Sequence, residues 1–191
     1  MKARLTFITE VLGTQPGNPE VFQDYVASKN PDAEPEELGT TVEEVEKKST
    51  LFRRDASGNL CLVDYMIKGH IKAVGSAISQ RRKAADKTPW TAFKSRVDMN
   101  VHVFPRMISF GIQEPDGILE RPLRAETARG PRVSLARSEM VNAGRSVEVE
   151  IITRGIITEA QIRECLDEGK FYGISQWRNA GYGRYEWEEV K

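Results

Sequence analysis

The residue types best suited to chemistry gather in a glycine-rich segment near the C-terminus, from Gly169 to Trp187. Its glycines permit positive φ angles and a close backbone approach to a ligand, its arginines and asparagine offer donors to phosphate oxygens, and its aromatic rings offer faces for stacking. These residues are Gly173, Gly181, Gly183, Arg178, Asn179, Arg184, Tyr172, Trp177 and Tyr182. The pattern is typical of a polyanion-binding loop, and the alternative is an aromatic β-turn whose Trp177 lies in the core.

Charge is unevenly distributed along the chain, although the formal net charge is zero. Residues 20–67 hold 11 acidic and 5 basic residues, a net charge of −6, whereas residues 68–145 hold 15 basic and 7 acidic residues, a net charge of +8. Ten of those 15 bases are arginines, whose planar forks suit phosphate. Because the bases are not interleaved with acids in the sequence, the pattern favours phosphate or nucleic-acid contact over a salt-bridged surface.

Composition limits the class of protein. A length of 191 residues predicts one domain, and we expect no membrane contact and a cytoplasmic location because no apolar run approaches ~20 residues and no charged-then-apolar leader is present. Cys61 and Cys165 lie far apart and form no CxxC pair, which predicts two buried thiols rather than a disulfide or a zinc site. With His70 and His102 as the only histidines, we expect no metal and no cofactor.

Periodicity and turn residues predict the elements in the first half of the chain. A strand runs over about residues 3–12 and ends in a turn, after which Asn18 and Pro19 open a short helix that leads into an acidic stretch over 31–46. A turn over 53–59 joins two short apolar runs into a hairpin. Asp64 is then expected to cap a long helix. The buried stripe of that helix is predicted to be Ile67, Ile71, Val74 and Ile78.

The second half of the chain is predicted in the same way. Strict alternation over 97–104 indicates a half-buried strand with His102 on its outer face. The arginine-rich stretch over 114–144 is typical of a projecting β-hairpin, and alternation over 147–152 indicates another strand. Thr158 and Gln161 form a capping box for a second core helix, and a final strand follows the glycine-rich segment.

Without its insertions, the predicted order is strand, helix, strand, and then strand, helix, strand. That order is the split βαβ arrangement of the ferredoxin-like fold, in the α+β class. We therefore predict a single domain over residues 1–191, with an acidic insertion over about 18–48 and a basic β-hairpin insertion over about 112–145.

Three segments, in this order, are similar to a known family. The first strand ends in Gly13-Thr14 and a turn, the segment from Arg54 to Leu60 leads into the segment from Ile67 to Lys72, and the glycine-rich loop joins the second helix to the last strand. Together they resemble the RAMP superfamily of CRISPR ribonucleoprotein subunits. In that family a ferredoxin-like core carries a glycine-rich loop between its second helix and fourth strand.

The resemblance implies which residues contact nucleic acid. Residues that open the first core helix of the family face the guide RNA backbone, and here they are Lys68, the Gly69 amide and Lys72, near a helix N-terminus. The alternative is that the two lysines are simply a solvated helix face. Because they lie four apart on one face with no charge expected opposite them, phosphate contact is favoured. The full set of predicted contacts is Lys68, Gly69, Lys72, Arg124, Arg129, Arg132, Arg137, Trp177, Arg178, Asn179, Gly181, Tyr182, Gly183 and Arg184.

The resemblance also bears on catalysis. Family members that process guide RNA use a histidine on the 2′-hydroxyl, which makes His70 and His102 the candidates, but we interpret them as a packed and a surface histidine. Backbone subunits that cleave target RNA use an aspartate shortly before the Arg-Asp turn, where this chain has Ser49. Asp55 itself is typical of a turn aspartate whose side chain caps the backbone.

We therefore expect a non-catalytic RAMP-like protein that binds single-stranded nucleic acid, RNA being favoured, and can repeat along the strand. Self-association or CRISPR effector subunits would supply further partners. One alternative is a metal-independent endoribonuclease that uses His70 or His102. Another is an interaction protein, because the chain also looks like phage-encoded proteins, which could mimic an effector subunit and block a host defence complex.

Overall fold

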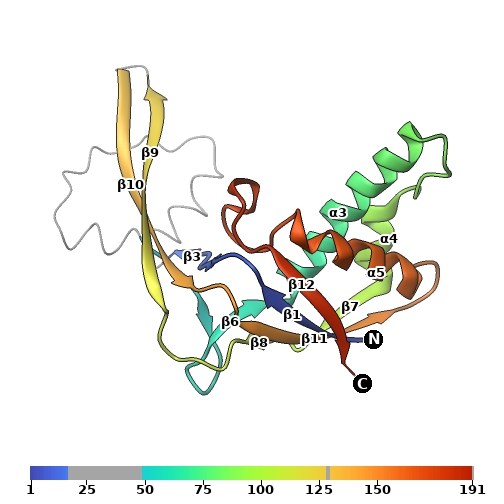
Figure 1. Cartoon of the computed structure of the whole chain (residues 1–191), viewed down its shortest axis with the longest axis horizontal. Coiled ribbons are helices and arrows are strands. Elements are labelled where there is room, and N and C mark those ends of the chain that lie inside the picture. Colours follow the sequence, from blue (N-terminus) through green and yellow to red (C-terminus); the bar gives the residue numbers. More distant parts are fainter. Residues whose placement is uncertain (17–48, 128–129, 191) are drawn as a thin grey trace, which may run out of the picture.

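A computed structural model describes residues 1–16, 49–127 and 130–190 of the chain (Figure 1). The fold is mixed α+β, as predicted, with three α-helices in the described ranges. The short helix predicted to begin at Asn18 and the acidic stretch over 31–46 lie outside the described residues, as does the whole predicted insertion over 18–48.

Four strands form the main sheet in the order β12-β1-β11-β7, with every neighbouring pair antiparallel. Their bounds are Lys2–Phe7 for β1, Val101–Phe104 for β7, Ser146–Thr153 for β11 and Tyr185–Val190 for β12. Alternate side chains such as Leu5 and Val149 are buried on one face. On the other face Arg4 forms ion pairs of 2.8 Å with both Glu148 and Glu188. The sheet therefore has one core face and one face of paired charges.

The long helix α3, Asp64–Ala84, lies on the core face of this sheet (Figure 1). The four residues predicted to form its buried stripe are all buried, because their spacing places them on one side of the helix. The predicted cap is one residue off: Asp64 is the first helical residue, Val63 occupies the cap position, and no side chain caps this end.

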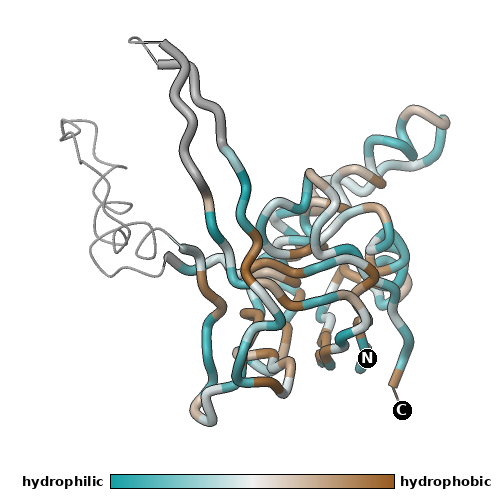
Figure 2. Tube along the Cα trace, turned by 60° about the vertical axis from the view of Figure 1, so that its left-hand side comes forward, coloured by the Kyte–Doolittle hydropathy of each residue, from teal (hydrophilic) through white to brown (hydrophobic). Residues whose placement is uncertain are grey.

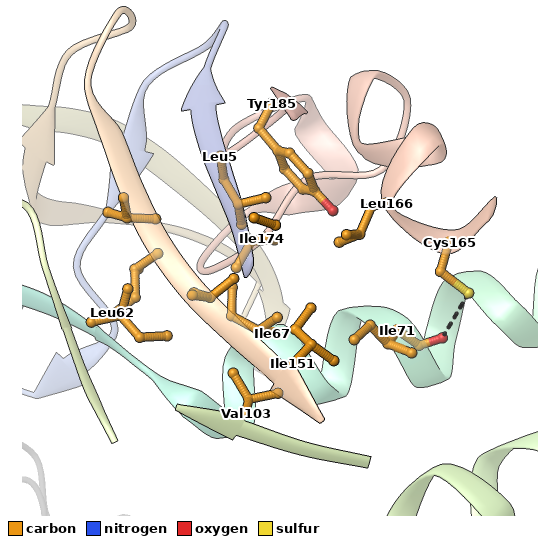
Figure 3. Packing of buried hydrophobic residues seen from close by; sticks show 14 of the residues in the cluster. Leu5, Leu62, Ile67, Ile71, Val103, Ile151, Cys165, Leu166, Ile174 and Tyr185 are labelled. Atoms are coloured by element: carbon orange, nitrogen blue, oxygen red, sulfur yellow. Dashed lines mark hydrogen bonds between the residues drawn. The ribbon is translucent and has the colours of Figure 1, made fainter. Parts of the chain in front are cut away.

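The second core helix α5, Glu159–Asp167, packs beside α3 and contributes Cys165 and Leu166 to the same core (Figure 3). Its capping box is present as predicted. The Thr158 hydroxyl accepts from the Gln161 backbone N–H at 3.3 Å, and the Gln161 side chain accepts from the Thr158 N–H at 3.0 Å. These two bonds satisfy donors that a helix start otherwise leaves unpaired.

The strand predicted over 97–104 is wrong in its first half. Residues Phe93–Asn100 form the helix α4, and only Val101–Phe104 form β7. Phe93 and Val97 are four residues apart, so a helix buries both against α3, while Met99 is 79% exposed. Alternation of apolar and polar residues fitted both structures over so short a stretch. The predicted first strand is likewise split, since β1 ends at Phe7 and Val11–Leu12 forms β2 in another sheet.

A smaller three-stranded sheet contains the predicted turn. Its strands are β5 (Arg53–Arg54), β6 (Leu60–Val63) and β8 (Met107–Ser109), in that order. Between β5 and β6 the Asp55 carboxylate accepts from the backbone N–H groups of Ser57 and Asn59, both at 2.9 Å. The Asn59 bond is the main cause that lowers the pKa of Asp55. Asp55 thus closes the turn, as the sequence predicted.

The predicted arginine-rich hairpin is present and projects from the body of the molecule (Figures 1 and 2). It consists of β9 (Gly117–Thr127) and β10 (Gly130–Val141). At its base β10 also pairs with β2 and with β4 (Thr50–Leu51), which pairs in turn with β3 (Gln15–Pro16). These extra strands fix the root of the hairpin beside the C-terminal loop.

Both cysteines are buried free thiols, as predicted. The Cys165 Sγ donates to the Ile71 carbonyl at 3.8 Å (Figure 3), and burial raises the pKa of this thiol. Across the described ranges, none of the helices combines the length and apolar character that a bilayer crossing requires.

Two glycines of α3 give a matched test of the packing between α3 and α4. A Cβ at Gly75 would overlap the Phe93 ring, whereas a Cβ at Gly69 meets nothing within 4 Å. We expect Gly75→Ala to lower the free energy of unfolding by about 1–3 kcal/mol through overpacking. Gly69→Ala should raise it by about 0.5–1 kcal/mol, because alanine favours a helix interior. Urea denaturation of both variants measures this, and equal effects would contradict the close α3–α4 contact.

Candidate nucleic-acid interface

The C-terminal loop over 168–184 is held by its own backbone. It begins with the short 3-10 helix η1 (Glu168–Lys170) and contains a second, η2 (Arg178–Ala180). The Ile174 N–H donates to the Gly183 carbonyl at 2.9 Å, and the Gly183 N–H donates to the Glu10 carbonyl at 2.8 Å. A Cβ at Gly183, which has a φ of +70°, would overlap the Ile174 carbonyl. These glycines are predicted to allow a close approach to a ligand, whereas the close approach in the structure is between the two arms of the loop.

His70 of α3 joins the loop to the core. It is 1% exposed, its Nδ1 lies 3.3 Å from the Gly173 carbonyl oxygen, and its Nε2 lies 2.9 Å from the Tyr185 hydroxyl. Because the carbonyl can only accept, Nδ1–H is the donor and Nε2 accepts from the Tyr185 hydroxyl. Burial, opposed by the Gly173 bond and aided by the charge of Arg178, lowers the pKa of His70 to about 4. His70 is therefore a neutral packed residue at pH 7.

A pocket of about 470 Å³ opens between α3 and the loop. Helix α3 supplies one wall, and the loop supplies two aromatic rings, two arginines and an amide side chain. The lining residues are His70, Ala73, Val74, Phe171, Tyr172, Gly173, Arg178, Asn179 and Arg184. The structure thus brings together three predicted contacts, Arg178, Asn179 and Arg184, with apolar residues that the sequence did not assign to the site.

Trp177 lies at the edge of the loop that faces the hairpin. It is 37% exposed, so it is not the core tryptophan of the alternative interpretation. Its ring stacks on Tyr182 with centroids 5.7 Å apart, and the Arg121 guanidinium of β9 lies 3.5 Å from its centroid. The loop and the root of the hairpin therefore meet in a cation–π contact.

Arg121 belongs to the basic stretch over 68–145 but is not among the predicted nucleic-acid contacts. It is 8% exposed, and its Nε and Nη1 are buried without a hydrogen-bond partner. Burial lowers the pKa of Arg121. Its cross-strand neighbour is Ala136, which offers no polar group to pair with the guanidinium. Nothing in the sequence separates Arg121 from the other arginines, because only the β9–β10 register reveals this neighbour.

Lys68 and Lys72 do not lie opposite an empty surface, which corrects the expectation about their charge. The Lys68 Nζ donates to the Asp98 carbonyl at 2.9 Å, and the Lys72 Nζ forms an ion pair of 2.8 Å with the Asp98 carboxylate. Because α3 begins at Asp64, Lys68 and Gly69 lie in its second turn, beyond the free N–H groups of the helix start. The unpredicted helix α4 supplies Asp98, so the sequence could not show this pairing.

Arginines of the hairpin and of the turn that follows it are also partly neutralised. Arg137 forms an ion pair with Glu120, its cross-strand neighbour, and Arg145 pairs with Asp116 at 2.6 Å. Acids that are separated from these bases in sequence thus meet them across the strands, contrary to the expected lack of a salt-bridged surface. Arg129 and the side chains of Arg124 and Arg132 lie outside the described part of the structure.

The second histidine, His102, lies apart from this interface. It is exposed on the outer face of β7, opposite Ile152 of β11. A smaller hollow of about 350 Å³ beside it is lined by Asp64, Tyr65 and Lys68, among others. His70 of α3 therefore lies on the core side of the main sheet, and His102 of β7 lies on the open side. Among the described residues, no group of three or more histidine, cysteine or acidic side chains could hold a metal ion.

Comparison with known proteins places the fold. No protein-family model and no curated protein matches the sequence. The cryo-EM structure of the Type III-B Cmr-beta bound to cognate target RNA contains a chain that matches with a TM-score of 0.52 and 9% sequence identity. The fold is similar to that of a Type III-B Cmr chain. The match covers 100% of this chain and 58% of the Cmr chain, so this chain spans little more than half of the Cmr chain's length.

The His70 contacts predict a specific pH dependence of stability. The pKa of His70 is about 4 in the folded state and 6.5 in the unfolded chain. Between pH 4 and pH 6.5 the unfolded chain therefore binds one proton that the folded protein does not. The stability that a neutral His70 contributes is fully present above pH 6.5 and is lost as the pH falls. The free energy of unfolding should be lower by about 3 kcal/mol at pH 4. His70→Asn keeps a donor to Gly173 and should lose this dependence. Urea denaturation of both proteins across this range measures the difference, and parallel curves would contradict a neutral His70.

Proposed function

We propose that this chain binds single-stranded nucleic acid, RNA being favoured, along the surface formed by the C-terminal loop and the root of the hairpin. One observation carries the proposal. Arg121, Arg178 and Arg184 gather around this loop, and among the described residues none of the three forms an ion pair with an acid. Unpaired arginines beside exposed aromatic rings suit a strand of phosphates and bases.

The arrangement of the core supports this assignment. The strand order β12-β1-β11-β7, with α3 between β1 and β7 and α5 between β11 and β12, supports a ferredoxin-like core. A glycine-rich loop after the second core helix then supports a RAMP-like subunit. The similar Cmr chain comes from a structure bound to cognate target RNA, which favours RNA over DNA as the ligand. Further copies of the chain or effector subunits are the protein partners that this similarity suggests.

The open face of the main sheet is a poor competing surface for a polyanion. Arg4 is already paired with Glu148 and Glu188 there, and Glu150 and Glu186 add further negative charge. Phosphate groups would be repelled from these carboxylates at short range. The charge distribution therefore favours binding at the loop over binding on the sheet.

The proposed role is non-catalytic. A general base must reach the proton that it removes, yet both ring nitrogens of His70 are occupied within the core. His102 lies on the outer face of the sheet, away from the loop, and the Asp55 carboxylate accepts bonds from its own turn. These placements support binding without cleavage and give the endoribonuclease alternative no assembled site among the described residues.

Arg178→Gln tests the proposed surface. We expect it to weaken binding of a fluorescein-labelled oligouridine by about tenfold or more, because it removes one charge-assisted contact worth about 1.5–3 kcal/mol. The slope of log affinity against log salt should fall in magnitude by about 0.7, the value for one phosphate of a single strand. Fluorescence anisotropy at several salt concentrations measures both quantities.

Arg154→Gln is the matched control for this change. Arg154 follows β11 at the end of the sheet opposite the loop, since Phe7 pairs with Tyr185 at the loop end and Thr153 pairs with Val101 at the other. It carries the same charge and lines no part of the pocket. Equal losses in the two variants would mean that binding follows net charge alone and would contradict a defined surface.

Arg121→Met separates the contribution of Arg121 to binding from its contribution to folding. Methionine keeps an unbranched apolar side chain similar to the aliphatic part of arginine and removes a buried cation with two unpaired donors. The change removes a cation–π contact that stabilises the fold by about 0.5–2 kcal/mol. It also removes the desolvation cost of burying unpaired donors, which is about 1–3 kcal/mol for each group. We expect the free energy of unfolding to stay level or rise while oligouridine affinity falls. A variant that unfolds more readily and binds as well as the wild type would assign Arg121 a structural role only.

A further inference from the structure

The pocket beside α3 is a concave site within the charged surface. Its volume of about 470 Å³ lies in the range of small-molecule sites, which is about 300–1,000 Å³. Phe171 and Tyr172 border it and are 60% and 41% exposed, although both are large apolar side chains. Ala73 and Val74 of α3 line the side of the pocket that the helix forms. The pocket therefore offers aromatic and aliphatic surface to a planar apolar group.

The polar residues of the pocket are positively charged or neutral. Arg178 and Arg184 line it without an acidic partner in the described ranges, and the Arg184 Nε is buried without a hydrogen-bond partner. Asn179 adds an amide that can both donate and accept. His70 adds no charge at pH 7, since its pKa is about 4. An anionic group is thus favoured at the arginines, with neutral hydrogen-bonding groups beside it.

These two sets of residues suit the two halves of a nucleotide. A phosphate needs the planar donor forks that arginine provides, and a base needs a face for stacking and an amide for its polar edge. A carboxylate or an inorganic anion would use the arginines and leave the exposed rings without a role. A neutral aromatic compound would leave two unpaired arginines beside it. Only a ligand that carries both groups uses the whole lining.

We infer that this pocket takes one nucleotide of the bound strand, with its base against Phe171, Tyr172 and the α3 wall and its phosphate at Arg178 and Arg184. The inference rests on the proposed function and adds a defined subsite to it. Binding along the rest of the loop would then follow the backbone, while this subsite would hold a single unit. A free nucleoside monophosphate carries the same two groups and should therefore bind alone.

Isothermal titration with uridine and adenosine 5′-monophosphates tests the subsite, with the nucleosides and inorganic phosphate as reference ligands. We expect a monophosphate to bind more tightly than either of its halves. Ala73 is exposed on α3 and lines the pocket, so Ala73→Trp should fill the space and weaken nucleotide binding by about tenfold or more. Ala84→Trp is the control, because Ala84 is exposed at the end of the same helix and lies outside the pocket lining.

A second variant covers the case in which Ala73→Trp does not fold. Tyr172→Leu removes an exposed ring without changing the charge, and we expect it to weaken nucleotide binding while phosphate binding stays the same. Nucleotide affinity that is unchanged in the variants, or no better than that of phosphate, would overturn the subsite. Oligouridine binding by the wild type would in that case still support the proposed function. A protein that binds nucleotides and ignores oligouridine would support the pocket and contradict the proposed function.

Discussion

Two hydrogen bonds of one buried histidine fix the C-terminal loop to the rest of the protein. His70 donates to Gly173 in the loop and accepts from Tyr185 at the start of β12, so a helix, a loop and a strand meet at a single neutral ring. Tyr185 is fully buried, and its edge packs on Phe7 of β1, which links the same contact to the centre of the sheet. This ring therefore links the loop to α3 and to the main sheet.

Backbone contacts complete the attachment and leave the loop side chains available. Gly173 and Gly183 let the two arms of the loop approach so closely that any side chain would displace one of them. Thr9 adds a hydroxyl that donates to the Gly181 carbonyl at 3.0 Å and accepts from the Arg184 N–H at 2.8 Å. Since main-chain groups and a residue of the core hold the loop, Arg178, Asn179 and Trp177 are not required to stabilise it.

Local patterns in the sequence predicted the parts of the fold that local physics decides. The helical stripe from Ile67 to Ile78 and the capping box at Thr158 depend on residues close in sequence, and both are present. The pattern failed where the same apolar and polar residues suit both a strand and a helix, as in 93–100. There the helix is selected by packing on Gly75. The burial of Arg121 could not be predicted for a related reason. It follows from the register of two strands and from a loop that lies far along the chain.

Charge counts along the sequence indicate the proposed binding surface only roughly, because folding decides which charges remain unpaired. In the basic stretch over 68–145, Lys72, Arg137 and Arg145 pair with Asp98, Glu120 and Asp116, so these three cations are not free to bind phosphate. Solvent weakens these exposed pairs as contributors to stability, yet each still cancels the long-range field of a cation. A polyanion is attracted by the cations that remain without an acidic partner after folding. On that measure Arg178 and Arg184 of the loop and the adjacent Arg121 outweigh the paired cations Lys72, Arg137 and Arg145.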